Sequence, residues 1–173
     1  MKNIEGVVPI VHTPFNDQDE IDWESFDRQV SWALGREIQG LAIGMVSEVL
    51  RLTSSERREL TEHLVSVAAG QVVTIASAGA ESIDEAIEFA VHAEQAGCDG
   101  VMAIPPTSTA LPDEDVLEYF RRIASAIELP IIVQDASSYV GQPIGISVYT
   151  RLLDEFGDDR IYFKPESAPL GPN

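Results

Sequence analysis

The sequence has 173 residues, of which 45% are apolar and 23% are charged, and its formal net charge is −18 at pH 7. This length is enough for one or at most two globular domains with a sizeable core. No apolar run approaches the ~20 residues of a membrane span, and the start lacks the long apolar segment of a secretory signal. We therefore expect a cytoplasmic protein that binds no membrane. Eleven basic residues against 29 acidic ones also argue against a nucleic-acid-binding protein.

The cysteine and lysine content narrows the chemistry further. Cys98 is the only cysteine, which excludes an intrachain disulfide and a cysteine-rich zinc site. The only lysines are Lys2 and Lys164. A lysine-poor, acidic surface is typical of proteins in a salt-rich cytoplasm, and it also fits an ordinary acidic cytosolic protein. Because the acidic field repels anions, an acid ligand needs a local positive group.

Short apolar runs rich in β-branched residues recur with a period of about 30 residues, which predicts strands buried on both faces of a parallel sheet. These runs begin near Val7, Leu41, Val72, Val101, Ile131 and Ile161.

Apolar residues at helical spacing predict five helices between these runs. The first follows a cap at Asp22, and Thr53-x-x-Glu56 and Ser82-x-x-Glu85 are capping boxes that begin the second and third. The fourth ends before Pro130, and the fifth opens at Ser147 and stops at Gly157. Their inward stripes comprise Trp23, Phe26, Val30, Leu34; Leu60, Leu64, Val67; Phe89, Ala90, Ala93; Leu117, Phe120, Ile123, Ile127; and Leu152, Leu153, Phe156.

Single helices between strands at this period imply right-handed βαβ units, which a doubly wound sheet or a TIM (β/α)8 barrel would contain. Residues 11–15 contain no glycine, so the phosphate loop of a nucleotide-binding doubly wound sheet is missing. A complete barrel typically needs ~250 residues. We therefore predict one barrel domain over residues 1–173, truncated after the sixth strand, and expect further residues beyond Asn173. A non-functional truncated module, or an oligomer that covers the gap, is the alternative.

The carboxyl ends of the strands hold the candidate chemistry, because ligands of parallel α/β folds bind there. Lys164 follows the apolar residues 161–163. A desolvated lysine loses its proton more readily, and its neutral amine can attack a carbonyl to form a Schiff base. A lysine that extends into solvent, or that pairs with Glu166, is the alternative.

Five features of the sequence occur in a familiar order and spacing over the whole chain. Residues 6–15 read Gly-Val-Val-Pro-Ile-Val-His-Thr-Pro-Phe, 52–57 read Leu-Thr-Ser-Ser-Glu-Arg, and 97–106 read Gly-Cys-Asp-Gly-Val-Met-Ala-Ile-Pro-Pro. Together with Leu-Pro-Ile-Ile at 129–132, they resemble the dihydrodipicolinate synthase/N-acetylneuraminate lyase superfamily of class I aldolases. Lys164 falls on the Schiff-base lysine of that superfamily. The resemblance implies a barrel-fold lyase, and Schiff-base chemistry requires no metal or other cofactor.

Three loops depart from the usual superfamily pattern. Residues 44–48 read Gly-Met-Val-Ser-Glu instead of Gly-Thr-Thr-Gly-Glu, and Pro106 and Thr107 replace a tyrosine pair. Residues 134–137 read Gln-Asp-Ala-Ser instead of Tyr-Asn-x-Pro, and a glutamine amide cannot transfer a proton as a phenol can. The 2-keto-3-deoxy-L-arabonate dehydratases look similar at four stretches, which are Ser47-Glu48, residues 102–106, residues 133–136 and Tyr-Phe-Lys-x-Glu at 162–166.

This second resemblance implies dehydration of a 2-keto-3-deoxy sugar acid through a Schiff base on Lys164. Glu48 and Asp135 are then candidates for acid–base work, and the candidate substrate-binding residues are Ser47, Gln134, Pro105 and Thr13. A salt bridge to Arg51 or Arg57 is the alternative for Glu48, and capping of the following turn is the alternative for Asp135.

Two other functions stay open at this point. One is a synthase or aldolase that forms or breaks a C–C bond with pyruvate, and the other is a non-catalytic α/β module. In either catalytic case we expect the protein to bind a small-molecule 2-keto acid, to form a homo-oligomer and to need no metal.

Overall fold

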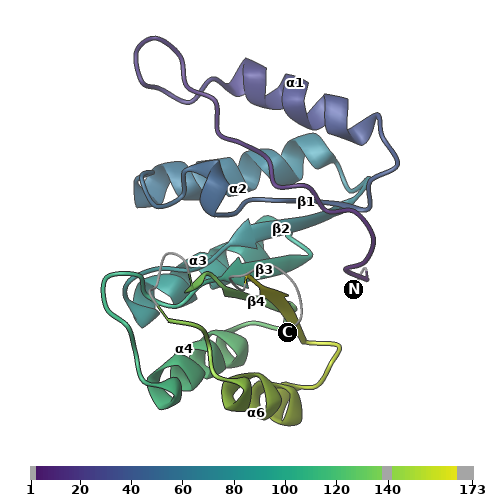
Figure 1. The fold of residues 1–173 in the computed structure, drawn as a ribbon. Coiled ribbons are helices and arrows are strands. Elements are labelled where there is room, and N and C mark those ends of the chain that lie inside the picture. The colour runs from purple at the N-terminus through teal and green to yellow at the C-terminus, as the bar shows by residue number, and fades with distance from the viewer. Residues whose placement is uncertain (1–2, 138–141, 167–173) are drawn as a thin grey trace. The chain divides into compact units, whose positions relative to one another are not determined.

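Helices and parallel strands alternate along the chain (Figure 1). The computed structural model describes residues 3–137 and 142–166, so Lys2 and the end of the predicted domain, residues 167–173, lie outside the described residues. Its contacts divide the chain into two compact units. The first unit comprises residues 1–77 and 95–99, and the second comprises residues 78–94 and 100–173.

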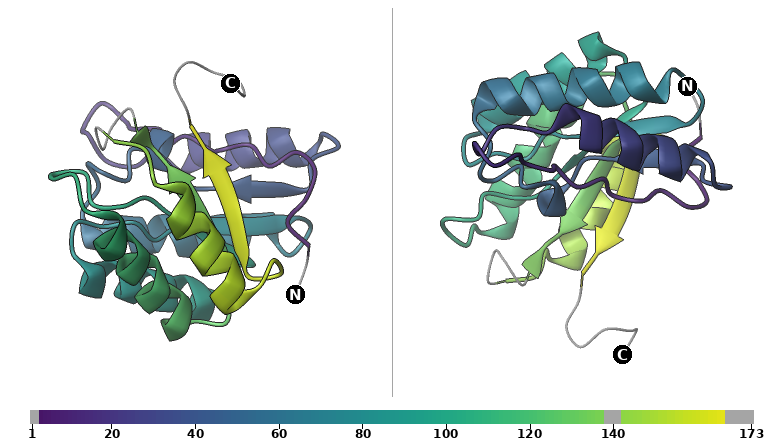
Figure 2. Two further views of the ribbon diagram at one scale, coloured as in Figure 1. Left: turned by 60° about the horizontal axis from the view of Figure 1, so that its bottom comes forward. Right: turned by 90° about the horizontal axis from the view of Figure 1, so that it is seen from above.

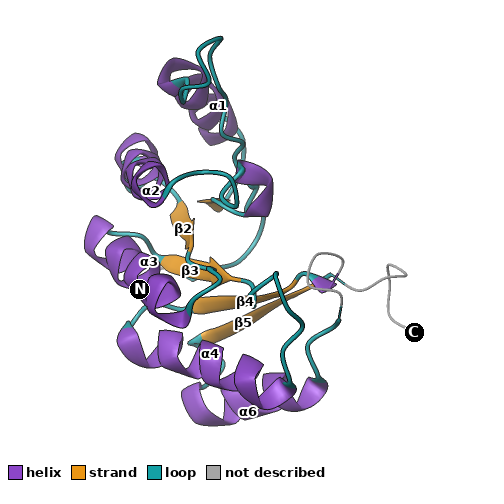
Figure 3. Cartoon of the chain, turned by 90° about the vertical axis from the view of Figure 1, so that its left-hand side faces the viewer, coloured by secondary structure: helices purple, strands orange, loops and turns teal. Residues whose placement is uncertain are grey.

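The first unit contains two helices and two parallel strands. Strand β1 pairs with β2, with Gly40 opposite Val73, and α1 and α2 lie side by side (Figure 3). Its core is built from fully buried side chains of both helices and of β1, including Phe26, Leu41 and Leu60. The elements are α1 (Trp23–Leu34), β1 (Gly40–Ala42), the 3-10 helix η1 (Met45–Ser47), α2 (Ser54–Ala68) and β2 (Val73–Ser77).

The second unit contains three parallel strands in chain order, β3 beside β4 and β4 beside β5. Helices α4 and α6 lie side by side and cover one face of β4 and β5 (Figure 2). The predicted stripe Leu117, Phe120 and Ile123 is fully buried in this unit. Its elements are most of α3 (Ile83–Ala96, to residue 94), β3 (Gly100–Ala103), α4 (Asp113–Ala126), β4 (Ile131–Asp135), α6 (Ile146–Phe156) and β5 (Ile161–Pro165).

Helices α1 and α2 begin at the caps that the sequence predicts, whereas α6 begins at Ile146, one residue before the predicted Ser147, after Gly145, which has no side chain to cap it. Asp22 accepts a hydrogen bond from the Ser25 amide at 2.9 Å. Thr53 accepts from the Glu56 amide while the Glu56 carboxylate accepts from the Thr53 amide at 2.7 Å, so this capping box is confirmed. Each bond satisfies an amide that has no partner inside its helix.

The expected strand near Val7 is not formed among the described residues. Ile10 makes only an isolated parallel bridge to Ala42, with the Val11 amide donating to the Ala42 carbonyl at 2.9 Å. Pro9 and Pro14 flank this bridge, and proline has no amide hydrogen to extend a ladder. The sequence therefore overestimated the number of strands by one.

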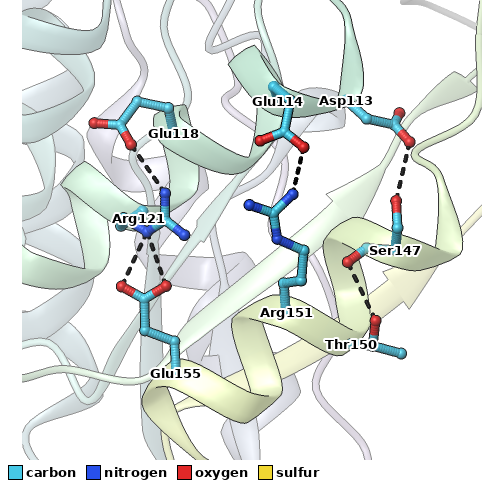
Figure 4. Close-up of polar contacts among 8 residues, drawn as sticks. All are labelled: Asp113, Glu114, Glu118, Arg121, Ser147, Thr150, Arg151 and Glu155. Carbon is cyan, nitrogen blue, oxygen red and sulfur yellow. Dashed lines mark hydrogen bonds and ion pairs between the residues drawn. The ribbon is translucent and has the colours of Figure 1, made fainter.

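A row of polar contacts joins α4 to α6 at the surface (Figure 4). Arg121 of α4 donates to Glu155 of α6 at 2.8 and 2.9 Å, Arg151 of α6 pairs with Glu114, and Ser147 donates to Asp113 at 3.2 Å. Exposed ion pairs each contribute only about 0–1 kcal/mol, so the buried stripe provides most of the stability. We refer to these contacts as the α4–α6 seam.

Candidate active site

Lys164 lies on β5 directly opposite Gln134 of β4. Its ammonium group donates to Glu166 Oε1, and Gln134 Nε2 donates to the same oxygen at 2.6 Å. Gln134 is buried, whereas 42% of the Lys164 side chain is exposed. The second unit therefore brings Lys164, Gln134 and Glu166 together at the carboxyl ends of two neighbouring strands. The ion pair with Glu166 is the alternative that the sequence left open for Lys164.

Glu166 is a functional candidate that the sequence analysis did not select. Alternate residues of an extended chain point to the same side, so the spacing Lys164-x-Glu166 is the signal that predicts their contact. In the ion pair the amine carries its proton, and it must lose that proton before it attacks a carbonyl. Glu166 is the adjacent base that can accept it.

Asp135 is almost fully buried, with 6% of its surface exposed. Its Oδ2 accepts hydrogen bonds from the Tyr149 hydroxyl at 3.2 Å and from the Ile144 amide at 3.3 Å. Oδ1 has no hydrogen-bond partner in the described part of the chain. Burial and the negative charge of Asp135 both raise the pKa of Tyr149 above its ordinary value. The bond from Ile144 reaches nine residues along the chain, so capping of the turn directly after Asp135 stays a prediction.

Thr13 and Ser47 are in direct contact in the first unit. The Thr13 hydroxyl donates to the Ser47 carbonyl at 2.6 Å. The Ser47 hydroxyl donates to the Val11 carbonyl and accepts from the Gly44 amide at 3.1 Å. Both side chains are buried. Their hydroxyl groups fix the shape of residues 44–47, and their predicted contact with a substrate stays a prediction.

Glu48 follows Ser47 with a left-handed backbone, at φ 61°. Its carboxylate pairs with Arg51 at 3.2 Å, and 83% of the Arg51 side chain is exposed. An ion pair this exposed contributes little to stability, about 0–1 kcal/mol. Glu48 makes the local salt bridge that was the alternative to a catalytic role.

Pro105 follows β3 in the second unit and is buried. The loop after it is held by Glu81, which accepts from the Thr107 hydroxyl at 2.5 Å, from the Thr107 amide at 2.8 Å and from the Ser108 amide at 3.2 Å. Partial burial tends to raise the pKa of Glu81. The hydrogen bonds from Ser108 and Thr107 outweigh that effect and lower the pKa to about 2.

We expect this depressed pKa to make the stability contribution of Glu81 depend on pH. Glu81 has an ordinary pKa of 4.5, so its ionised form contributes stability above that value and loses it as the pH falls towards about 2. In urea titrations of the full-length protein, Glu81→Gln should therefore be less stable than the wild type at pH 6, and the difference should shrink between pH 5 and 2. Thr107→Val, which removes one of the donors, should show part of the same trend. A difference independent of pH would contradict this explanation.

Cys98, the single thiol, precedes β3 and is buried. Burial, and after it the charge of Asp99, raises the pKa of this thiol to about 12. The thiolate is the reactive form of cysteine, so burial holds Cys98 in its less reactive thiol form. Among the described residues, no three His, Cys, Asp or Glu side chains are grouped so that they could hold a metal ion.

Comparison with known proteins identifies the family. The model of the dihydrodipicolinate synthetase family matches residues 3–156. The chain belongs to this family. The predicted superfamily is therefore confirmed, and the match leaves the dehydratase branch unassigned.

Relatives in the dihydrodipicolinate synthetase family are similar over most of this chain. The 4-hydroxy-tetrahydrodipicolinate synthase of Agrobacterium fabrum is 33% identical over 130 residues, which are 75% of this chain and 44% of that protein. The synthase of the same name from Methanococcoides burtonii is 32% identical over 149 residues, covering 86% of this chain and 50% of that protein. The chain thus spans about half the length of the curated relatives it matches.

The fold of the family is also found in solved structures. Dihydrodipicolinate synthase from Aquifex aeolicus matches with a TM-score of 0.89 and 25% identity, over 96% of this chain and 56% of that chain. The predicted fold class, part of a TIM (β/α)8 barrel, is confirmed by this match. None of the described helices has the length and apolar character needed to cross a membrane.

Proposed function

We propose that the protein containing this chain is a lyase that forms a Schiff base between Lys164 and a 2-keto acid. The observation that supports this most directly is the placement of Lys164. Its amine lies at the end of a parallel strand and touches a carboxylate that a buried glutamine also holds. A nucleophilic amine with an adjacent, fixed base is the arrangement that covalent catalysis requires.

The proposed mechanism begins with proton transfer from the Lys164 ammonium to Glu166. The neutral amine then attacks the C2 ketone, and loss of water gives an iminium ion that acidifies the protons on C3. A base removes one C3 proton to form an enamine. An acid then protonates the C4 hydroxyl, which the enamine expels as water. Hydrolysis of the imine releases the product and restores the lysine. For a five-carbon substrate, that product tautomerises to 2-oxoglutarate semialdehyde.

The dehydration branch is supported by the residues around Lys164. Gln134 replaces the tyrosine that the superfamily usually has at the end of this strand, and its amide is oriented by Glu166. Because an amide transfers no proton, the acid–base work in this proposal falls to Glu166. Gln134 would contact a substrate hydroxyl. Glu48 and Asp135 are acid–base candidates from the sequence alone.

The remaining predicted contacts rest on the sequence alone. Ser47 is proposed to bind the substrate carboxylate together with amides of its loop, and Thr13 and Pro105 are proposed substrate-binding residues. Cytoplasmic location and a homo-oligomeric state remain predictions. The named relatives favour a second candidate, condensation of a 2-keto acid as in a 4-hydroxy-tetrahydrodipicolinate synthase.

Borohydride trapping tests the proposal in the full-length protein. Reduction in the presence of pyruvate or a 2-keto-3-deoxy-pentonate should give a stable adduct, which peptide mass mapping should place on Lys164. Product analysis then separates the two candidates. Dehydration of the 2-keto-3-deoxy-pentonate yields 2-oxoglutarate semialdehyde, whereas an enzyme of the condensing type consumes pyruvate with an aldehyde and, in the reverse direction, releases pyruvate from the pentonate. A protein that forms no adduct with any of these acids is not a Schiff-base lyase.

A further inference from the structure

Asp135 and Gln134 are neighbours in sequence, but their side chains point to opposite faces of β4. Gln134 lies opposite Lys164 in the strand register and shares Glu166 with it. Asp135 instead bonds to Tyr149 of α6, one of the helices that cover the other face of β4 and β5. Successive side chains of a strand alternate between the faces of a sheet, so both observations agree. Asp135 therefore lies behind the strand and not beside the amine.

Tyr149 contacts both strands that carry the site. Its hydroxyl donates to Asp135 at the end of β4. Its ring packs edge-on against Phe163 of β5, with ring centroids 4.7 Å apart. Phe163 directly precedes Lys164, as Gln134 directly precedes Asp135. Tyr149 thus holds Asp135, which is the neighbour of Gln134, and Phe163, which is the neighbour of Lys164.

The backbone of Asp135 connects this contact to Glu166. The Glu166 amide donates to the Asp135 carbonyl at 3.0 Å. Through this bond, the position of Asp135 sets the position of the carboxylate that binds Lys164.

The α4–α6 seam holds Tyr149 in place from the outside. Ser147 and Arg151, two residues before and after Tyr149, contact Asp113 and Glu114 of α4 (Figure 4). The helix that presents the hydroxyl is therefore anchored on both sides of it.

From these contacts we propose that Tyr149 and Asp135 form a positioning pair on the helix-facing side of β4 and β5. This inference rests on the proposed function, because the side chains that it positions are Gln134, Lys164 and Glu166. A displacement of about 1 Å in reacting groups can reduce a rate by about a hundredfold. A hydrogen bond from behind the strands thus affects the rate without touching the substrate.

Two variants of Asp135 separate positioning from acid–base catalysis. Asparagine keeps an oxygen that can accept from both Tyr149 and Ile144, but it cannot transfer a proton. Asp135→Asn in the full-length protein should therefore keep kcat within about tenfold of wild type with the same pH profile, whereas Asp135→Ala should lose about a hundredfold, the scale of a misplaced reacting group. If Asp135→Asn loses as much as Asp135→Ala, or loses one limb of the pH profile, Asp135 is an acid–base catalyst and the proposal is wrong.

Tyr149→Phe tests the other member of the pair. It should lower kcat and the rate of adduct formation by about tenfold, with KM within about twofold of wild type, because the ring stays against Phe163 while the hydroxyl is lost. Tyr119→Phe is the matched control, since the Tyr119 hydroxyl donates to the Ala80 carbonyl at 3.0 Å in the same unit. Equal loss of kcat in both tyrosine variants would overturn the positioning role.

Hydrogen exchange gives a readout that does not depend on activity. The Glu166 amide should exchange faster in Asp135→Ala and Tyr149→Phe than in wild type, and at the wild-type rate in Tyr119→Phe. If the Glu166 amide exchanges at the wild-type rate in Asp135→Ala, the positioning pair is wrong, even if the wild-type protein forms the adduct. If wild type forms no adduct but exchange changes as expected, the proposed function fails while the positioning contact stands.

Discussion

Lys164→Arg in the full-length protein should reduce turnover of a 2-keto acid by at least about a thousandfold, the order of loss seen when a covalent nucleophile is removed. It should also abolish the borohydride-trapped adduct. Arginine stays protonated at any accessible pH and cannot form a Schiff base, but its guanidinium can still pair with Glu166. The substitution therefore removes the nucleophile while it keeps the charge that holds Glu166.

The other lysine among these 173 residues provides the matched control for this experiment. Lys2→Arg makes the same chemical change elsewhere in the sequence, and it should leave both turnover and the adduct on Lys164 intact. Steady-state kinetics and peptide mapping of both variants separate a specific loss from a general effect of lysine replacement. Residual turnover near the wild-type rate in Lys164→Arg would show that another residue carries the chemistry.

Phe120→Ala should produce the largest loss of stability among single substitutions in α4. The side chain is fully buried and packs edge-on against Tyr119, with ring centroids 5.3 Å apart. Removal of a buried phenylalanine ring costs about 3–5 kcal/mol, because apolar contacts are lost and a cavity is left. Denaturant unfolding of the full-length protein measures this as a lower midpoint with an unchanged slope.

An exposed apolar residue of the same unit is the control for this loss. Ile146 begins α6 with 79% of its surface exposed, so Ile146→Ala removes apolar atoms that are already in water. Its effect on the free energy of unfolding should stay within about 0.5 kcal/mol. Comparable losses in both variants would mean that the α4 stripe is not the core of the second unit.

Features that depend on short sequence patterns were predictable. The period of apolar runs locates five observed strands, and the caps at Asp22 and Thr53 locate helix starts to within a residue. These signals are local, since a cap and its amide lie three residues apart. The prediction of a strand near Val7 was wrong. It rested on apolar content alone, whereas Pro9 limits the pairing of this segment to a single bridge.

Features of the candidate site that depend on distant residues were not predictable. The position of Lys164 at a strand end follows from the sequence, but its pairing with Gln134 depends on the register of β4 and β5. The Ser47 hydroxyl bonds to the Val11 carbonyl, 36 residues away in the chain. The side on which Asp135 lies follows from strand alternation only once the strand bounds are known.

The buried thiol gives this protein a built-in probe of its own dynamics. Cys98 cannot react with an alkylating reagent until the segment around it opens and its pKa returns towards 9. Because it is the only cysteine among these 173 residues, the labelling rate of the peptide that contains it reports the opening of one known position. Salt and ligand effects on that opening can then be followed without any engineered label.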